Sequence, residues 1–92
     1  MSTTKYVRAG KFLENLRVLR NDKKTAVSGR VRKSKEWVTR VEKGEFVLGD
    51  IEDILKAYDP RGRMLDEFHD ALRQDVQEVL GKTSNQGVEV GV

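Results

Sequence analysis

The residues with the clearest capacity for chemistry lie between Ser34 and Gly44, in the sequence SKEWVTRVEKG. Their charged and hydroxyl side chains recur at the spacing that places them on one face of a helix. This face consists of Lys35, Glu36, Thr39, Arg40 and Lys43. It can hydrogen bond to the edges of DNA bases and to phosphates, although exposure to solvent alone is the commoner fate of a charged helix face.

The same stretch carries the signals of a short helix. Ser34 is a good N-cap, because its hydroxyl can accept a free backbone N–H of the first turn. Trp37, Val38 and Val41 fall on the opposite, apolar face at a spacing suited to burial. Gly44 supplies the left-handed residue on which helices often end. Such a helix would present its polar face outward from a packed core.

Apolar residues at helical spacing predict four further helices, over residues 11–21, 25–31, 51–58 and 63–80. Asn21 tolerates the left-handed conformation and is expected to end the first of them. Asp22 or Thr25 is expected to cap the second. Asp50 is expected to cap the helix over 51–58, which Pro60 then ends.

These elements predict one small all-α domain, because 92 residues with 37% hydrophobic content leave little room for a second core. Residues 1–10 are expected to form a flexible arm in which Tyr6 is an exposed aromatic. The apolar loop residues Phe46, Val47 and Leu48 are expected to close the core. Residues 81–92 are Gly-rich and polar and are expected to be disordered.

Composition excludes several kinds of site. The chain has no cysteine and a single histidine, His69, so disulfides, thiolate metal sites and histidine metal clusters are not available. We find no nucleophile–base constellation and no phosphate-binding glycine loop, so we expect no enzyme activity and no cofactor. No apolar run approaches the roughly 20 residues that span a bilayer. No signal-peptide pattern opens the chain, so a soluble cytoplasmic protein is expected.

Charge is distributed unevenly along the chain. Residues 1–49 hold 13 Lys and Arg against 5 Asp and Glu, a net charge of +8. Residues 50–92 hold 5 against 10, a net charge of −5. A basic first half favours a polyanionic partner, for which a nucleic acid is the natural candidate and an anionic membrane the weaker one.

Two motifs carry a resemblance to a known family. The pattern S-x-x-x-V-x-x-x-E-x-G is present from Ser34 to Gly44, and L-x-x-L-R is present from Leu13 to Arg17. Over about residues 12–59, the chain resembles the helix-turn-helix domain of phage repressors, Cro proteins and Xre-type regulators.

The resemblance implies a fold and an organisation of the chain. The fold is a five-helix, lambda-repressor-like helix-turn-helix domain with an extended C-terminal helix. The DNA-binding domain would occupy residues 11–60, and the C-terminal segment 61–80, which the resemblance does not cover, would hold the last helix predicted from its apolar spacing. In this family, the positions of Arg17 and Glu42 form a partly buried ion pair that joins the first helix to the third.

The DNA contacts follow from the same alignment and from the local density of positive charge. The residues expected to read bases are Ser34, Lys35, Glu36, Thr39 and Arg40. The residues expected to bind phosphates are Lys24, Arg30, Arg32, Lys33 and Lys43. Arginine and lysine favour guanine O6 and N7, whereas a glutamate can accept from cytosine N4.

The turn before the reading helix departs from the family pattern. The family usually has a glycine with positive φ followed by an apolar residue, and this chain has Arg32 and Lys33 instead. An arginine in the left-handed conformation costs roughly 1 kcal/mol or more.

The C-terminal helix raises the question of assembly. Its apolar stripe is Leu65, Phe68, Leu72, Val76 and Val79. It would serve either for dimerisation, which is slightly favoured, or for packing against the 51–58 helix of the same chain. Its outer face would carry the acidic residues Asp66, Glu67, Asp70, Asp75 and Glu78.

The sequence therefore predicts a sequence-specific double-stranded DNA-binding transcriptional regulator, more specifically a repressor. It would act as a homodimer on an inverted repeat with half-sites about 34 Å apart. The alternative is a protein-interaction module, antitoxin-like or an adaptor, built on the same fold. A second protein could also bind the C-terminal helix.

Overall fold

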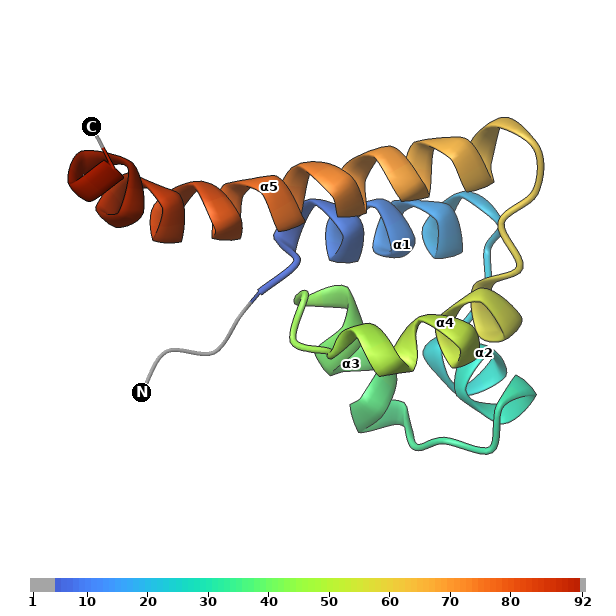
Figure 1. Cartoon of the computed structure of the whole chain (residues 1–92). Helices are drawn as coiled ribbons and strands as arrows, with labels where there is room; N and C mark the ends of the chain where they lie inside the picture. Colours follow the sequence, from blue (N-terminus) through green and yellow to red (C-terminus); the bar gives the residue numbers. More distant parts are fainter. Residues whose placement is uncertain (1–4, 92) are drawn as a thin grey trace.

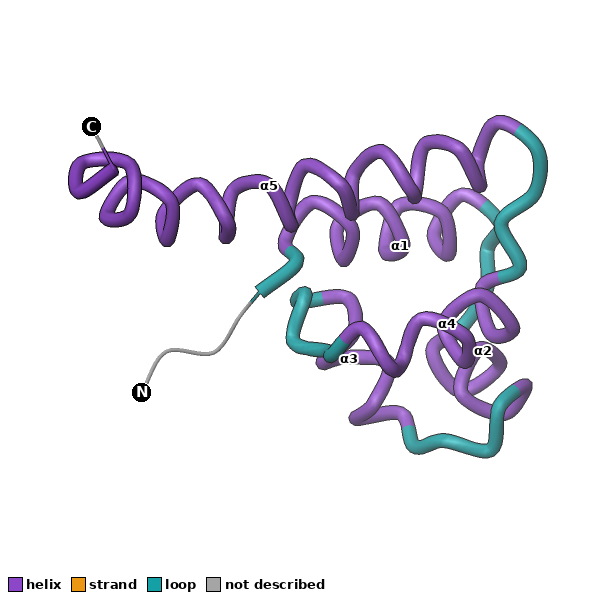
Figure 2. The backbone as a smooth tube through the Cα atoms, viewed as in Figure 1, coloured by secondary structure: helices purple, strands orange, loops and turns teal. Residues whose placement is uncertain are grey.

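The computed structural model describes the backbone of residues 5–91 and the side chains of residues 5–80. Within that part of the chain there are five α-helices, one short 3-10 helix and no strand, which confirms the all-α prediction (Figure 2). The helices are α1 (Val7–Leu19), α2 (Lys24–Arg30), α3 (Lys35–Glu42), η1 (Leu48–Asp50), α4 (Ile51–Tyr58) and α5 (Arg63–Gly91). None of these helices is both long and apolar enough to cross a membrane.

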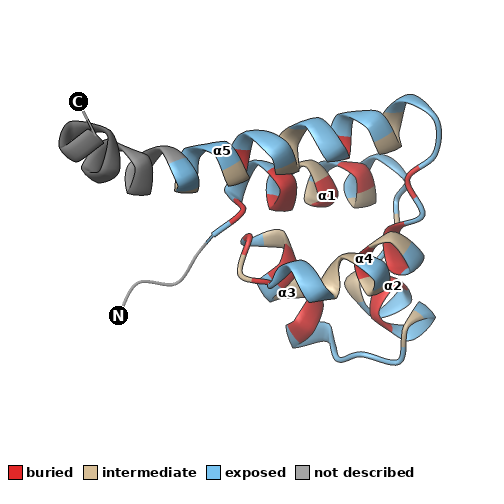
Figure 3. Cartoon of the chain, in the orientation of Figure 1, coloured by how far each residue is buried: buried red, intermediate tan, exposed pale blue. Residues whose placement is uncertain are grey.

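The helices form two layers (Figure 1). One layer is α5 lying antiparallel along α1, and the other is made of α2, α3 and α4. The buried positions of α1 and of the second layer face each other (Figure 3). The largest fully buried side chains are Leu13, Val27, Val38, Val41, Ile54, Tyr58 and Phe68.

Helix α5 packs within the chain, which was the less favoured of the two alternatives, but it packs mainly on α1 rather than on the 51–58 helix. Phe68 is 0% exposed and lies beside Phe12, with 6.2 Å between the ring centroids. The backbone of α5 continues as a helix to Gly91, whereas disorder was predicted from residue 81. The only proline of the chain lies before α5, so no proline interrupts the helical hydrogen bonding beyond that point.

Helix α1 begins at Val7, four residues before its predicted start. Tyr6 is only 8% exposed and stacks on Phe46, with 5.0 Å between ring centroids, so the prediction of an exposed aromatic is wrong. Burial of Tyr6 and Ala9 draws this segment into the core. The flexible arm predicted for residues 1–10 is therefore corrected at its end, and residues 1–4 lie outside the described residues.

Three successive helices end in the same way, with a left-handed residue and a hydrogen bond that closes the last turn. The left-handed residues are Asn21 (φ 60°), Arg32 (φ 56°) and Gly44 (φ 83°). After α2, the amide of Lys33 donates to the carbonyl of Ser28 at 2.9 Å. The predicted roles of Asn21 and Gly44 are confirmed, and Arg32 has the left-handed conformation expected of the family turn.

One predicted cap and part of one predicted core segment are wrong. Lys23, rather than Asp22 or Thr25, occupies the N-cap position of α2. Asp50 occupies the N-cap position of α4 as predicted, but its side chain makes no hydrogen bond to α4 and its carboxylate instead accepts from the amide of Val47 at 3.2 Å.

The predicted core segment consists of Phe46, Val47 and Leu48, and only Phe46 is buried. Val47 is 66% exposed and Leu48 is 53% exposed. The chain turns into η1 at Leu48, and of the three apolar residues only Phe46 has an aromatic partner in the core.

Candidate nucleic-acid interface

Helix α3 has one buried face and one exposed face. The hydroxyl of Ser34 accepts the backbone N–H of Trp37 at 3.1 Å, which confirms Ser34 as the N-cap. Trp37, Val38 and Val41 are 8%, 0% and 1% exposed. Because these three side chains anchor α3, its remaining face is held outward.

The exposed face of α3 carries four charged side chains, namely Lys35, Glu36, Arg40 and Lys43. Within the described part of the chain, none of the four makes a side-chain hydrogen bond or ion pair. Three of them are cationic, so the face as a whole is positive. These groups are available to an anionic ligand without breaking any contact in the protein.

Two predicted base-reading hydroxyls already have partners within the chain. The Ser34 hydroxyl is engaged in the cap of α3. The Thr39 hydroxyl donates to the carbonyl of Lys35 at 3.2 Å and accepts from Lys24 Nζ at 3.2 Å. The structure thus brings Lys24, at the start of α2, onto the side of α3 and holds its ammonium group there.

Among the predicted phosphate ligands, Arg30 faces the protein. Its guanidinium donates to the carbonyl of Ala57 at 2.9 Å and pairs with Asp22 Oδ2 at 3.2 Å. Arg20 donates to the carbonyls of Tyr58 and Asp59. Two arginines therefore satisfy the last carbonyls of α4, where a positive charge also complements the helix dipole.

Lys33 is also engaged within the chain. Its ammonium group lies 3.7 Å from Asp53 Oδ2 and 5.9 Å from the centroid of the Trp37 ring. Arg32, which precedes it in the turn, is exposed and has no side-chain partner in the described residues. Of the three cations at positions 30, 32 and 33, Arg32 is therefore the one most available for a ligand.

The predicted ion pair between Arg17 and Glu42 is confirmed. Arg17 Nε and Nη2 lie 2.6 and 3.2 Å from the two carboxylate oxygens of Glu42, a bidentate arrangement. Both side chains are largely buried, at 13% and 6% exposed. The pair joins α1 to the last turn of α3, and the hydrogen bonds that Arg17 donates to Glu42 raise the pKa of Arg17 above its ordinary value.

Tyr58 completes this cluster, a role that was not predicted from the sequence. Its hydroxyl donates to Glu42 Oε2 at 2.9 Å, and the residue is 1% exposed. Burial first, and the neighbouring negative charge of Glu42 second, raise the pKa of Tyr58. The sequence did contain a signal for this role: Tyr58 lies on the apolar stripe of α4, and a buried tyrosine hydroxyl usually needs a hydrogen-bond acceptor.

The predicted dimerisation residues differ in exposure. Phe68 is fully buried inside the monomer, so it is not available to a partner. Leu65, Leu72, Val76 and Val79 are half-buried. A hollow of about 270 Å³ on the outside of α5 is lined by His69, Leu72, Arg73 and Val76.

Asp75 was predicted on the outer acidic face of α5, and that prediction is wrong. The residue is 3% exposed and accepts backbone N–H groups from α1. The position is drawn inward because the first turn of α1 has donors that need an acceptor.

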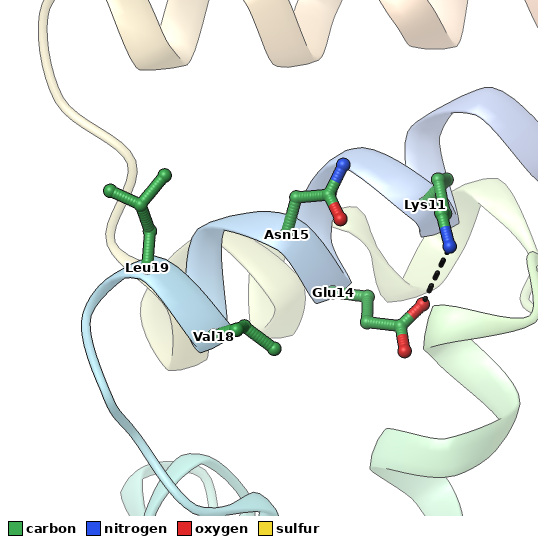
Figure 4. Close-up of a pocket in the computed structure, with 5 residues that line it drawn as sticks. All are labelled: Lys11, Glu14, Asn15, Val18 and Leu19. Atoms are coloured by element: carbon green, nitrogen blue, oxygen red, sulfur yellow. Dashed lines mark ion pairs between the residues drawn. The ribbon is translucent and has the colours of Figure 1, made fainter.

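A second hollow lies along α1 (Figure 4). Lys11 and Glu14 form an ion pair at 3.6 Å on its rim. Val18 and Leu19 are 61% and 75% exposed at its other end. Among the described residues, no group of three His, Cys, Asp or Glu side chains gathers in a way that could hold a metal ion.

Comparisons with protein-family models, with curated proteins and with solved structures found no match to this chain. What the protein does is therefore inferred from the arrangement of its own residues.

Proposed function

We propose that the protein is a sequence-specific, double-stranded DNA-binding transcriptional regulator that reads the major groove with α3. One observation carries the proposal: the exposed face of α3 holds cationic side chains that have no side-chain partner among residues 5–80, while its other face is anchored in the core. An eight-residue helix is about 12 Å long, and a helix with its side chains fits the roughly 12 Å wide major groove.

Base recognition would come from Lys35, Glu36 and Arg40. Arg40 is the best candidate for guanine, because a guanidinium can donate to O6 and N7 together. Lys35 would contact guanine as a point charge, and Glu36 would accept from cytosine N4. Glu36 also repels phosphates, so it would select among sequences rather than add affinity.

Phosphate contacts would come from Lys24, Arg32 and Lys43, which flank the reading face at the start of α2, in the turn and at the end of α3. Thr39 would hold Lys24 in place through the 3.2 Å hydrogen bond. Arg30 and Lys33 are left out of this set, because their charges are already paired with Asp22 and Asp53.

A helix-turn-helix domain of the phage-repressor, Cro and Xre type is the fold that this proposal implies. The packing of α2 on α3 across a short turn with a left-handed residue supports it. The Arg17–Glu42 ion pair, found at the expected positions, supports it independently.

The active species would be a homodimer joined through α5. Leu65, Leu72, Val76 and Val79 recur at the spacing of a helix–helix seam and stay partly exposed in the monomer, although Leu72 and Val76 also pack against its core. If two copies of α5 pack antiparallel about a two-fold axis near residue 70, Asp66 of each copy faces Arg73 of the other. This self-complementary charge pattern favours a second copy as the partner of the seam.

The test is selection of bound fragments from a pool of random duplexes at two salt concentrations. An inverted repeat enriched at both concentrations supports a dimeric reader of a specific site. Binding that collapses as salt rises, with no enriched motif, contradicts specific recognition. The protein-interaction alternative would then replace it.

A further inference from the structure

The first turn of α1 is capped by a side chain from α5. Tyr6 occupies the N-cap position but makes no side-chain hydrogen bond to the turn. Asp75 replaces it: Oδ1 accepts the N–H of Arg8 at 3.2 Å, and Oδ2 accepts the N–H of Ala9 at 2.9 Å. Asp75 lies 67 positions after Arg8 and 66 positions after Ala9 in the chain. A carboxylate here also complements the positive end of the α1 dipole.

The side chain of Arg8 strengthens this contact. Its guanidinium lies 3.3 Å from Asp75 Oδ1 and 2.6 Å from Glu78 Oε2. The Asp75 carboxylate is 3% exposed and accepts three hydrogen bonds, so its burial is compensated. Two backbone donors and one side chain thus fix the start of α1 to a single point of α5.

The start of α1 is joined just as closely to the end of α3. The N–H of Tyr6 donates to the carbonyl of Gly44 at 2.9 Å. A Cβ added at Gly10 would lie 2.7 Å from the nitrogen of Gly44 and 2.8 Å from the carbonyl oxygen of Glu42. The two backbones are therefore in direct contact, and neither can slide without moving the other.

We propose that Asp75 is a positioning residue for DNA recognition. By capping α1 it fixes Tyr6, and Tyr6 holds Gly44 and with it the end of α3, where Arg40 lies in the last turn and Lys43 is the C-cap. The proposal rests on the proposed DNA-binding function and adds a route from α5 to the reading helix. A partner that shifts α5 would, by this route, change how the protein reads DNA.

The test compares Asp75→Ala and Asp75→Asn with Asp70→Asn as the matched control. Asp70 is an exposed carboxylate on the same helix, and its one ion pair among the described residues is with Arg73, at 3.4 Å. Circular dichroism first establishes that each variant is folded. Two quantities are then measured: amide hydrogen exchange at Tyr6 and Ala9, and affinity for a selected duplex and for a random duplex.

Asp75→Ala is expected to speed exchange of both amides at least tenfold. It should weaken binding to the selected duplex at least fivefold, and binding to random duplex by less, because random duplex loses only the proposed phosphate contact of Lys43. Asp75→Asn keeps one acceptor oxygen and should fall between Ala and the wild type. Asp70→Asn should leave all of these quantities within twofold.

Two results overturn the proposal: unchanged exchange at Tyr6 in a folded Asp75→Ala variant, or faster exchange with unchanged affinity for the selected duplex. If the wild type binds no duplex, the DNA-binding function fails, while the exchange data still decide whether Asp75 caps α1. If Asp75→Ala is unfolded, the proposal is tested by hydrogen exchange of the wild type with and without bound duplex. Coupling is reciprocal, so bound duplex must then slow exchange of the Ala9 amide at least threefold, and unchanged exchange overturns the proposal.

Discussion

At the scale of single residues, Arg32 stands in a conformation that costs free energy. Its φ is 56°, in the left-handed region that an arginine seldom adopts. Asn21 and Gly44 occupy the equivalent place after α1 and α3, and both residue types tolerate it. A cation at a strained position directly before α3 agrees with the phosphate contact proposed for Arg32.

Arg32→Gly is expected to raise the free energy of unfolding by about 0.5–1 kcal/mol, because the strain is relieved. The same change should weaken binding to all duplexes and reduce the salt slope by about one, because one phosphate contact is lost. Urea unfolding and salt-dependent titrations measure the two effects. Asn21→Gly is the control and should alter neither by much; a destabilised Arg32→Gly would contradict the strain.

Because the pKa of Tyr58 is raised in the folded protein, we expect the free energy of unfolding to fall at alkaline pH. The folded state raises its pKa above the ordinary value of 10.0, so above pH 10 the unfolded chain loses a proton that the folded protein keeps. The free energy of unfolding must therefore fall as pH rises, by at most about 1.4 kcal/mol per pH unit from this group.

Tyr58→Phe should lower stability at pH 7 by about 1–2 kcal/mol, because the hydrogen bond to Glu42 is lost. It should also flatten the decline between pH 10 and 11. Urea unfolding of both proteins at pH 7, 10 and 11 measures this difference. Parallel declines in the two proteins would show that Tyr58 is not the responsible group.

At the scale of the elements, the proposed function assigns affinity and specificity to different side chains on and beside α3. Arg40→Ala and Lys35→Ala should each reduce affinity for a selected site far more than affinity for random duplex, by about 1–3 kcal/mol. Lys24→Ala should weaken both and reduce the salt slope by about one. Fluorescence anisotropy with the two duplexes measures each variant, and equal losses on both duplexes for all three would contradict the assignment of base reading.

Local patterns in the sequence predicted most of the helical elements. Ser34, Gly44 and Asn21 carry their signals in their own chemistry, and the structure confirms all three. The Arg17–Glu42 pair was predicted from the resemblance and is confirmed.

Contacts between distant segments were beyond the reach of local patterns. In the sequence, Asp75 cannot be distinguished from the exposed acidic residues of α5, because its partners are backbone N–H groups at the start of α1. In the sequence, Arg30 belongs to a cluster of basic residues, and only the fold shows that it donates to a carbonyl at the end of α4. Tyr6 was assigned to an arm because its partner, Phe46, lies forty residues further along the chain.

At the scale of the whole molecule, the proposed dimer depends on the charges beside the α5 seam. Arg73→Asp would set two like-charged pairs opposite each other in the antiparallel arrangement and should weaken dimerisation about tenfold or more. The double variant Asp66→Arg, Arg73→Asp restores the complementary pattern and should recover the dimer. Sedimentation velocity measures both, with Arg63→Asp as a control of equal charge change away from the seam.

A double variant that stays as weak as Arg73→Asp would contradict the antiparallel arrangement. If the wild type is a monomer at all concentrations, the seam is not a self-interface. Binding of a second protein to α5 would then be the remaining use of the stripe.

The central claim is that α3 reads base pairs, and a parallel selection with two variants tests it most directly. Wild type, Arg40→Ala and the control Lys56→Ala, an exposed cation on α4, would each select fragments from one random duplex pool. We predict an inverted repeat for wild type and control, and loss of a guanine preference at one position in each half-site for Arg40→Ala. The same motif from all three proteins, or no motif from any, would contradict the claim.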